Sequence, residues 1–253
     1  MRRFSIILAF AFLATPALAD REIHIVHCLQ GCPTGTPETN DLIIRQIYAL
    51  SSNDDTKLAD WVAYTVTKET IGTSASLNRD WKSDPALDDS ETLEPDDYKG
   101  AHKHIKTDRG HMAPLASFAG TVFWRDTNYL SNITPQRSEL NQGSWLGLET
   151  AERELTWKQG EVWVLTGTLY EKPEDPLPGA DEPHKVPSGF WKVVALENGQ
   201  IAGFIFDQEL ARDAAYCDQS KPLQEIEDRS GLDLFPDAAA DWVSEDLRAD
   251  LGC

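Results

Sequence analysis

The stretch Thr107-Asp108-Arg109-Gly110-His111 brings a carboxylate, a guanidinium and an imidazole within four residues, and its glycine lets the backbone turn among them. Two further polar stretches follow, Asn128-Tyr129-Leu130-Ser131-Asn132-Ile133-Thr134-Pro135-Gln136 and Leu140-Asn141-Gln142-Gly143. From Leu140 to Trp157 apolar residues then recur at helical spacing, which predicts a helix. The sequence thus predicts two polar segments and a helix in close succession.

These segments contain what hydrolysis of a phosphodiester requires: a base for water, an electrophile for the charge of the phosphorane, and neutralisation of the leaving oxygen. His111 suits the first need because imidazole titrates near neutral pH. Asn141 suits the second as a neutral oxygen ligand to Mg²⁺, an ion that keeps several waters. Glu149 lies eight residues further on, a helical rise of ~12 Å, so it can support a metal-bound water but not share the ion directly.

Several polar residues near these segments have more than one interpretation. Arg153 is either a site residue or an i,i+4 partner of Glu149. Asn128 and Asn132 either belong to the site or are turn residues, since asparagine commonly bonds its own backbone. Three arginines can hold phosphate oxygens through paired hydrogen bonds: Arg79, Arg109 and Arg153.

Four other polar residues are expected to stay outside the catalytic set. Asp108 is expected to orient the backbone rather than bind metal, and Glu152 is expected to face solvent on the predicted helix. His102 and His104 lack partners at recognisable spacing, so both are interpreted as solvated loop residues.

The remaining chain predicts an α+β fold. β-Branched and aromatic runs at 61–67 and 162–167 indicate strands, and runs at 190–196 and 201–206 indicate a hairpin whose turn contains Asn198-Gly199. Because strands and helices mix without regular βαβ alternation, a mainly antiparallel sheet is favoured. The other predicted segments are short helices at 222–228 and 238–251, a long Asp/Pro-rich surface loop at 79–100 and an extended loop at 169–187.

Residues 1–19 resemble a secretory signal peptide, with an arginine pair, an apolar run and a small-residue cleavage site after Ala19. We therefore expect residues 20–253 to form one exported domain, in the periplasm or the medium, with no membrane association after cleavage. Loss of Arg2 and Arg3 would change the formal net charge from −19 to −21. Such a balance argues against nucleic-acid binding driven by global charge.

The four cysteines favour disulfides, because an even number in an exported chain usually pairs. Three pairings are conceivable, and proximity in sequence favours Cys28–Cys32 with Cys217–Cys253. A zinc site is the alternative, although its spacing fits no common finger. Its ligands would be His24, His27, Cys28 and Cys32.

Together the three polar stretches resemble those of the DNA/RNA non-specific endonuclease family of the ββα-metal, or His-Me finger, class, and the resemblance extends from about Cys28 to Cys253. It implies a central, mainly antiparallel sheet flanked by helices and long loops. It also implies His111 as general base, Asn141 as direct magnesium ligand and Glu149 as support for the metal through water. The other implied roles are Arg79 and Asn132 in catalysis, and Arg109, Arg153 and Asn128 in substrate binding.

The resemblance further implies that both DNA and RNA, single- and double-stranded, are cut to products with 5′-phosphates. Mg²⁺ would be the cofactor, Mn²⁺ a substitute, and a homodimer the assembly known among relatives. Two alternatives remain open: a phosphodiesterase of the same metal class that acts on another ester, and an exported binding protein that has lost activity. The intact set of His111, Asn141 and Glu149 speaks against the second.

Overall fold

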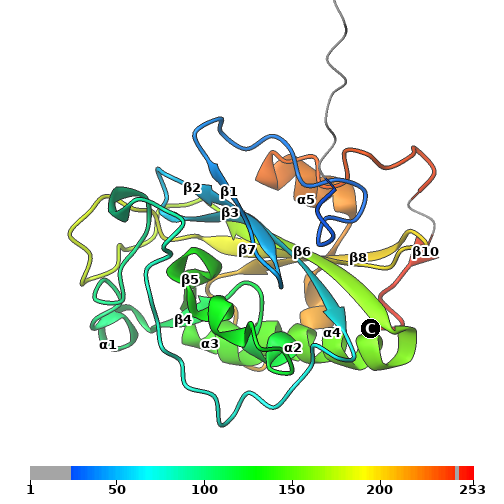
Figure 1. Cartoon of the computed structure of the whole chain (residues 1–253), viewed down its shortest axis with the longest axis horizontal. Helices are drawn as coiled ribbons and strands as arrows, with labels where there is room; N and C mark the ends of the chain where they lie inside the picture. The colour runs from blue at the N-terminus through cyan, green and yellow to red at the C-terminus, as the bar shows by residue number, and fades with distance from the viewer. Residues whose placement is uncertain (1–23, 243–244) are drawn as a thin grey trace, which may run out of the picture.

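A computed structural model describes residues 24–242 and 245–253, so the predicted leader at 1–19 lies outside the described residues. A large sheet has the strand order β1-β2-β3-β6-β7-β8-β10, with β9 paired to β8 (Figure 1). All pairs in it are antiparallel except β8 with β10. The strands are β1 Asp41–Ile44, β2 Ala49–Asn53, β3 Leu58–Thr67, β6 Glu161–Leu169, β7 Gly189–Ala195, β8 Gln200–Asp207, β9 Ser220–Lys221 and β10 Glu245–Asp246.

A second, two-stranded sheet pairs β4 (Thr107–His111) with β5 (Ile133–Arg137) on the side of the large sheet that carries α4. The α-helices are α1 Ala101–Ile105, α2 Leu115–Phe118, α3 Ser138–Leu140, α4 Leu146–Gln159 and α5 Leu223–Ser230. Short 3₁₀ segments are η1 Asp89–Glu91, η2 Trp124–Asn128, η3 Leu130–Asn132 and η5 Tyr216–Gln219, and η4 Asn141–Trp145 is a π-helical segment.

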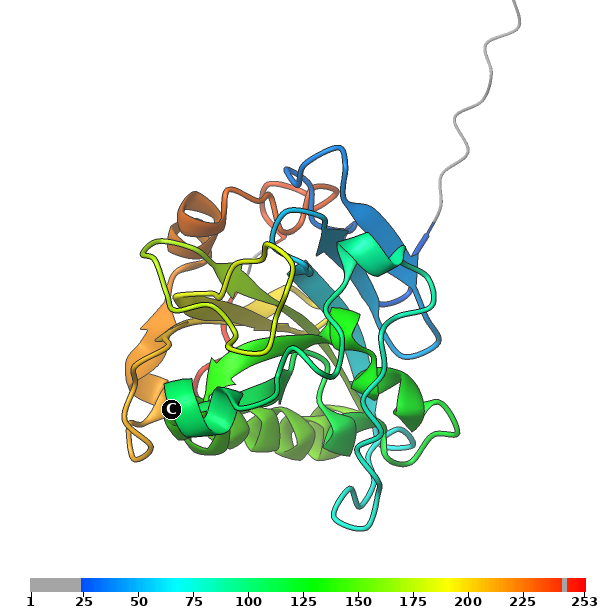
Figure 2. The same ribbon diagram turned by 90° about the vertical axis from the view of Figure 1, so that its left-hand side faces the viewer.

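The large sheet is covered on both faces, with α4 on one and α5 on the other (Figure 2). Successive side chains of a strand point to opposite faces, and this alternation separates two cores. The core beneath α4 includes Val62, Val164, Phe190, Phe204, Leu148 and Leu155. The core beneath α5 includes Trp61, Leu165, Trp191, Ile205 and Ile226.

Most predicted elements are confirmed. β3 and β6 contain the predicted strands at 61–67 and 162–167, and the predicted hairpin is β7–β8, where Gly199 adopts a φ of 87°. Residues 169–187 contain no helix, as expected. The short helix predicted at 222–228 is confirmed as α5, which begins one residue later and ends two residues later. The loop at 79–100 is long as predicted but not wholly at the surface, because Leu93 and Tyr98 are buried.

Two predicted helices need correction. The helix expected from Leu140 is broken at Gly143, whose φ of −111° and ψ of −115° are not helical. The helix expected at 238–251 is wrong for the described residues, which form turns and β10. There the backbone N–H of Leu247 donates to Ile201 O on β8, so strand pairing replaces helical hydrogen bonds.

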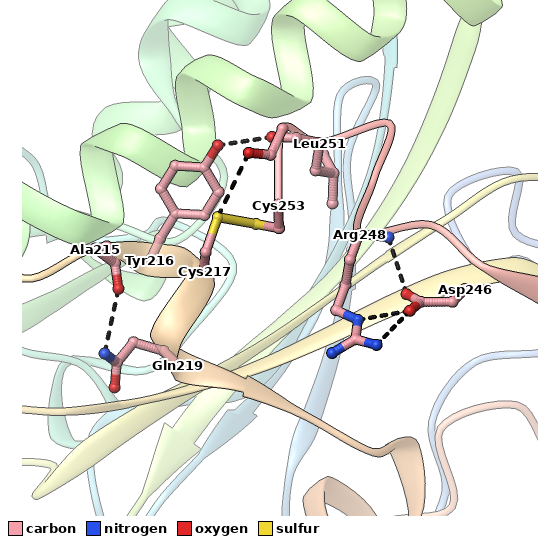
Figure 3. The surroundings of a disulfide bond; sticks show 9 residues. Ala215, Tyr216, Cys217, Gln219, Asp246, Arg248, Leu251 and Cys253 are labelled. Atoms are coloured by element: carbon pink, nitrogen blue, oxygen red, sulfur yellow. Dashed lines mark hydrogen bonds and ion pairs between the residues drawn. A yellow bond between two sulfur atoms is a disulfide. The ribbon is translucent and has the colours of Figure 1, made fainter.

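Both predicted disulfides are confirmed, Cys28–Cys32 and Cys217–Cys253. The second ties the end of the chain to η5, and next to it the Tyr216 hydroxyl donates to Leu251 O at 2.6 Å (Figure 3). The alternative zinc site is therefore wrong, because its two cysteines are oxidised to a disulfide. In the described part of the chain, none of the helices has the length and apolar character to span a membrane.

Candidate active site

The candidate site is built on a ββα unit in which β4 pairs with β5 and the helical segments from Ser138 onward follow β5. The register pairs His111 with Ile133 and Asp108 with Gln136, so the motif residues line one short ribbon. Gly110 is required at its position because a Cβ there would lie 2.7 Å from Gln136 Cβ, the root of a buried side chain on the paired strand. The local sequence thereby fixes how closely β4 and β5 approach.

His111 lies at the end of β4 and is partly exposed. Its Nε2 lies 3.2 Å from Asn128 Oδ1, and its ring packs against Trp81 with centroids 5.3 Å apart. Burial and, to a smaller extent, the charge of Arg79 lower the pKa of His111 to about 4, against the effect of the Asn128 hydrogen bond, which raises it. The imidazole is therefore neutral at neutral pH and can accept a proton.

The two asparagines of the second polar stretch differ in their environment. Asn132 is fully buried, accepts from the Ala113 N–H at 2.8 Å, and donates to the carbonyls of Ala113 and Thr127. Asn128 contacts His111, and its Nδ2 donates to Asn78 O, the residue before Arg79. Asn132 thus holds the backbone that follows His111, whereas Asn128 joins the histidine to the loop of Arg79.

Asp108 connects the two halves of the ββα unit, which its sequence position alone does not reveal. Its Oδ2 accepts hydrogen bonds from Asn141 Nδ2 at 3.1 Å and Gln142 Nε2 at 2.7 Å, and its Oδ1 accepts from the Ser138 hydroxyl at 2.6 Å. Burial would raise the pKa of Asp108, but the hydrogen bonds from these residues keep it below its usual value.

Of the two histidines expected in a loop, His102 lies on α1 and contacts this carboxylate, with Nδ1 3.1 Å from Asp108 Oδ1. Its interpretation as a histidine without partners is wrong. The sequence does not reveal this contact, because it arises only when α1 folds back beside β4, the strand that follows it in the chain. His104 also lies on α1, and its side chain lies near Gly100.

Arg109 is held between two aromatic rings. Its guanidinium carbon lies 4.9 Å from the centroid of Tyr98 and 5.7 Å from that of Trp81, and a terminal N–H donates to Pro95 O at 2.7 Å. Burial lowers the pKa of Arg109 below the usual value, yet a guanidinium stays charged at neutral pH. A cavity of about 300 Å³ lies beside it, lined also by Asp108 and Asn141.

The remaining basic candidates flank the site. Arg79 is exposed and acts on the His111 ring through its charge. Arg153 on α4 donates to Thr150 Oγ1 at 3.0 Å, and its charge favours the ionised form of Glu149. No ion pair within 4.0 Å joins Arg153 to Glu149 in the part of the chain that the structure describes, so of its two interpretations the i,i+4 ion pair is not formed.

Glu149 is buried on α4, with 8% of its surface exposed. Burial raises the pKa of Glu149 to about 7, the charge of Lys192 opposes that shift and the charge of Glu152 adds to it. Glu152, expected to face solvent, is instead completely buried and pairs with Lys192 at 2.9 Å. The prediction that Glu152 faces solvent is wrong because Glu152 has a charged partner, Lys192, inside the core of the sheet, which the helical pattern does not reveal.

The donor set around Asn141 fits a hard cation such as Mg²⁺. Because Asn141 Nδ2 is bonded to Asp108, the amide oxygen is left as the free end, next to the cavity. Among the described residues, groups of three or more histidine, cysteine or acidic side chains close enough to share an ion occur at Asp41, Asp54 and Glu91, and at Asp97, Asp181 and Glu182. Neither group includes a residue of the ββα unit.

Comparisons with known proteins agree with this architecture. The family model described as DNA/RNA non-specific endonuclease matches residues 30–241. The chain is 45% identical to a nuclease of Serratia marcescens, over 90% of this chain and 87% of that protein. It is 30% identical to mitochondrial endonuclease G of Homo sapiens, over 81% of this chain and 73% of that protein. A chain from the crystal structure of an EndoG/EndoGI complex superposes with a TM-score of 0.70 at 23% identity, covering 84% of this chain and 92% of that one, which confirms the predicted α+β fold.

Proposed function

Because this chain belongs to the DNA/RNA non-specific endonuclease family and is a metal-dependent hydrolase of nucleic acids, we propose that His111 is the general base of the reaction. The observation that carries the proposal is the neutral, partly exposed imidazole held by Asn128. When Asn128 Oδ1 accepts the Nε2–H, the lone pair lies on Nδ1, and that nitrogen takes a proton from the attacking water.

Asn141 would hold one Mg²⁺, with its oxygen directed to the ion because Asp108 binds its amide nitrogen. When bound, the ion would neutralise charge on the phosphorane and polarise water near the leaving 3′-oxygen. Glu149 would accept a hydrogen bond from such a water, as befits a buried carboxylate on the following helix. Asp108 would thereby position the side chain of Asn141, whereas the sequence indicated only that it orients the backbone.

The arginines would bind the phosphates. Arg109 is preorganised by its two aromatic neighbours, and Arg79 would stabilise the phosphate and the leaving group near His111. Arg153 would contribute positive potential from α4. Asn132 would act through the backbone alone, since its amide is fully used and 0% exposed.

The substrates would be DNA and RNA in single- and double-stranded form. A water from solvent attacks, not a ribose 2′-hydroxyl, so both sugars are acceptable and the products carry 5′-phosphates. Contacts to the phosphate backbone alone confer little sequence preference. With 42 acidic and 23 basic residues in the whole chain, substrate capture would rely on the local arginines around His111.

The test is to incubate the purified protein with supercoiled plasmid and with RNA, in Mg²⁺, in Mn²⁺ and in EDTA. We expect cleavage of both polymers with either ion, 5′-phosphorylated ends and no cleavage in EDTA. Intact polymers alongside hydrolysis of a small phosphodiester would support the alternative phosphodiesterase. Tight binding of DNA with no cleavage in any metal would support the inactive binding protein.

We further propose that the protein is exported after removal of residues 1–19, leaving 20–253 as one domain. The two disulfides support this, since such bonds persist in oxidising compartments. Mass spectrometry of the secreted protein would identify its first residue. The homodimer stays a prediction that sedimentation velocity would test.

A further inference from the structure

A buried ion pair lies beneath α4, outside the residues assigned to the reaction. Lys192 on β7 and Glu152 on α4 are both 0% exposed, with Nζ and Oε1 2.9 Å apart. The Tyr64 hydroxyl on β3 donates to the other carboxylate oxygen at 2.9 Å. The Lys192 ammonium also lies 4.1 Å from the centroid of the Trp145 ring. Two strands of the sheet are thus tied to one helix by polar contacts inside the core.

These contacts lie on both sides of Glu149 along the helix. Trp145, Glu149 and Glu152 are separated by four and three residues, so they share one face of the helical segment. Lys192 contacts the first and the last of the three and faces the turn between them. Together with the apolar packing of Leu148 and Leu155, these two contacts bear on the rotation of α4 about its axis, and hence on the direction of the Glu149 side chain.

Stability alone does not explain a charged pair at this position. Taking two charges out of water costs several kcal/mol for each ion, and apolar residues of similar volume often replace such a pair without loss of stability. The neighbouring inward-facing positions on β7, Phe190 and Val194, are apolar, as the core would favour. The ion pair of Lys192 with Glu152, and the Tyr64 hydroxyl that accepts from Lys192 and donates to Glu152, do what apolar side chains cannot, because these polar contacts favour one orientation of the helix.

We propose that Lys192 is a positioning residue for the nuclease reaction, which through Glu152 and Trp145 orients the turn of α4 that presents Glu149 to the metal site. This inference rests on the proposed role of Glu149. In this role Lys192 itself contacts neither the substrate nor the metal ion. It acts by holding the carboxylate where it can accept a hydrogen bond from a water of the ion.

The test uses the full-length mature protein and the double variant K192M/E152Q, which removes both charges and leaves an acceptor for the Tyr64 hydroxyl. The single variant K192M leaves Glu152 buried without its partner and is expected to unfold more easily, so the double variant carries the test. V193A is the matched control, because Val193 is the next residue on β7 and its side chain belongs to the core on the opposite face. Mg²⁺ and Mn²⁺ binding are measured by calorimetry without nucleic acid, alongside melting temperature and cleavage.

We expect K192M/E152Q to bind Mg²⁺ about 10-fold more weakly or worse, the range for loss of an outer partner of a metal site. Its kcat at saturating Mg²⁺ should fall as well, while the KM for DNA stays near that of wild type. V193A should lower the melting temperature with unchanged metal affinity. Wild-type metal affinity in K192M/E152Q, whatever its melting temperature, overturns the inference.

E149A separates this inference from the proposed function. If E149A binds Mg²⁺ as wild type does, the proposed role of Glu149 fails, and the inference about Lys192 fails with it. If E149A binds Mg²⁺ weakly and K192M/E152Q binds it normally, only the inference fails. We expect E149A and K192M/E152Q to weaken Mg²⁺ binding to a similar degree.

Discussion

Replacement of Asp108 tests how the ββα unit prepares Asn141 for a metal ion. One carboxylate oxygen accepts from Asn141 and Gln142, and the other accepts from Ser138. D108N keeps the shape but removes the charge, so the bond to Asn141 changes from a charged acceptor, ~1.5–3 kcal/mol, to a neutral one, ~0.5–1.5 kcal/mol. A difference of about 1.4 kcal/mol corresponds to roughly 10-fold in metal affinity.

D108A removes both acceptor oxygens and should weaken metal affinity more than D108N does. The expected loss is on the order of 100-fold, the upper end of the range for loss of a residue that supports a metal ligand. S138A is the matched control, because it deletes the contact to the other oxygen, along with the Ser138 contacts to Lys106 O and His102, and leaves the bond to Asn141 in place. Its half-saturating Mg²⁺ concentration should stay within about twofold of wild type, since Ser138 donates to the carboxylate oxygen that does not bind Asn141 and contributes little to the ligand's orientation.

The assay is cleavage of supercoiled plasmid over a range of Mg²⁺ concentrations, with direct metal titration by calorimetry. The order of metal affinity should be wild type, then S138A, D108N and D108A. If D108N and D108A both reach half-maximal rate at the wild-type Mg²⁺ concentration, Asp108 does not orient Asn141, and the positioning role is wrong.

Four further predictions follow from the fold and the charges. An NMR titration of the His111 ring should show a midpoint near pH 4, because burial favours the neutral form, so the base stays active through neutral pH; a midpoint above 6 would contradict this. G143A should reduce cleavage strongly, since its Cβ would lie 2.4 Å from Arg212 O and disturb the turn after Asn141; wild-type rates would argue against that turn. Replacing both Cys217 and Cys253 by serine should lower the free energy of unfolding by about 2–4 kcal/mol, measured by urea denaturation, and no change would refute the tether. Finally, cleavage should fall little with salt or peak at moderate salt, because the acidic chain repels its substrate; a steep loss from low salt upward would oppose this.

The sequence predicted the elements whose patterns are local. The strands of β3, β6, β7 and β8 follow from β-branched and aromatic runs, and the Asn198-Gly199 turn follows from its tolerance of positive φ. The helix at 238–251 could not be predicted correctly, because pairing of residues 245–246 with β8 depends on a strand some 45 residues earlier in the chain. Propensity gives no information about such a partner.

The site shows the same division. The motif residues were recognisable from their order, but the contacts of Asp108 with Asn141 arise only when β4 lies beside the segment after β5. Glu152 was misplaced for a related reason: a glutamate on an amphipathic pattern normally faces water, and only the lysine inside the sheet makes its burial tolerable. The pattern of residues along the sequence does not show which polar side chains will meet when distant segments pack together.

The most direct test of the central claim is the rate of DNA cleavage by H111G at saturating Mg²⁺, with and without added imidazole. The protein must first be shown to be folded by its circular dichroism and melting temperature. If His111 is the general base, the rate falls about 10²- to 10⁴-fold, and imidazole restores part of it by occupying the space left by the side chain. A rate within a few-fold of wild type in the absence of imidazole would contradict the account.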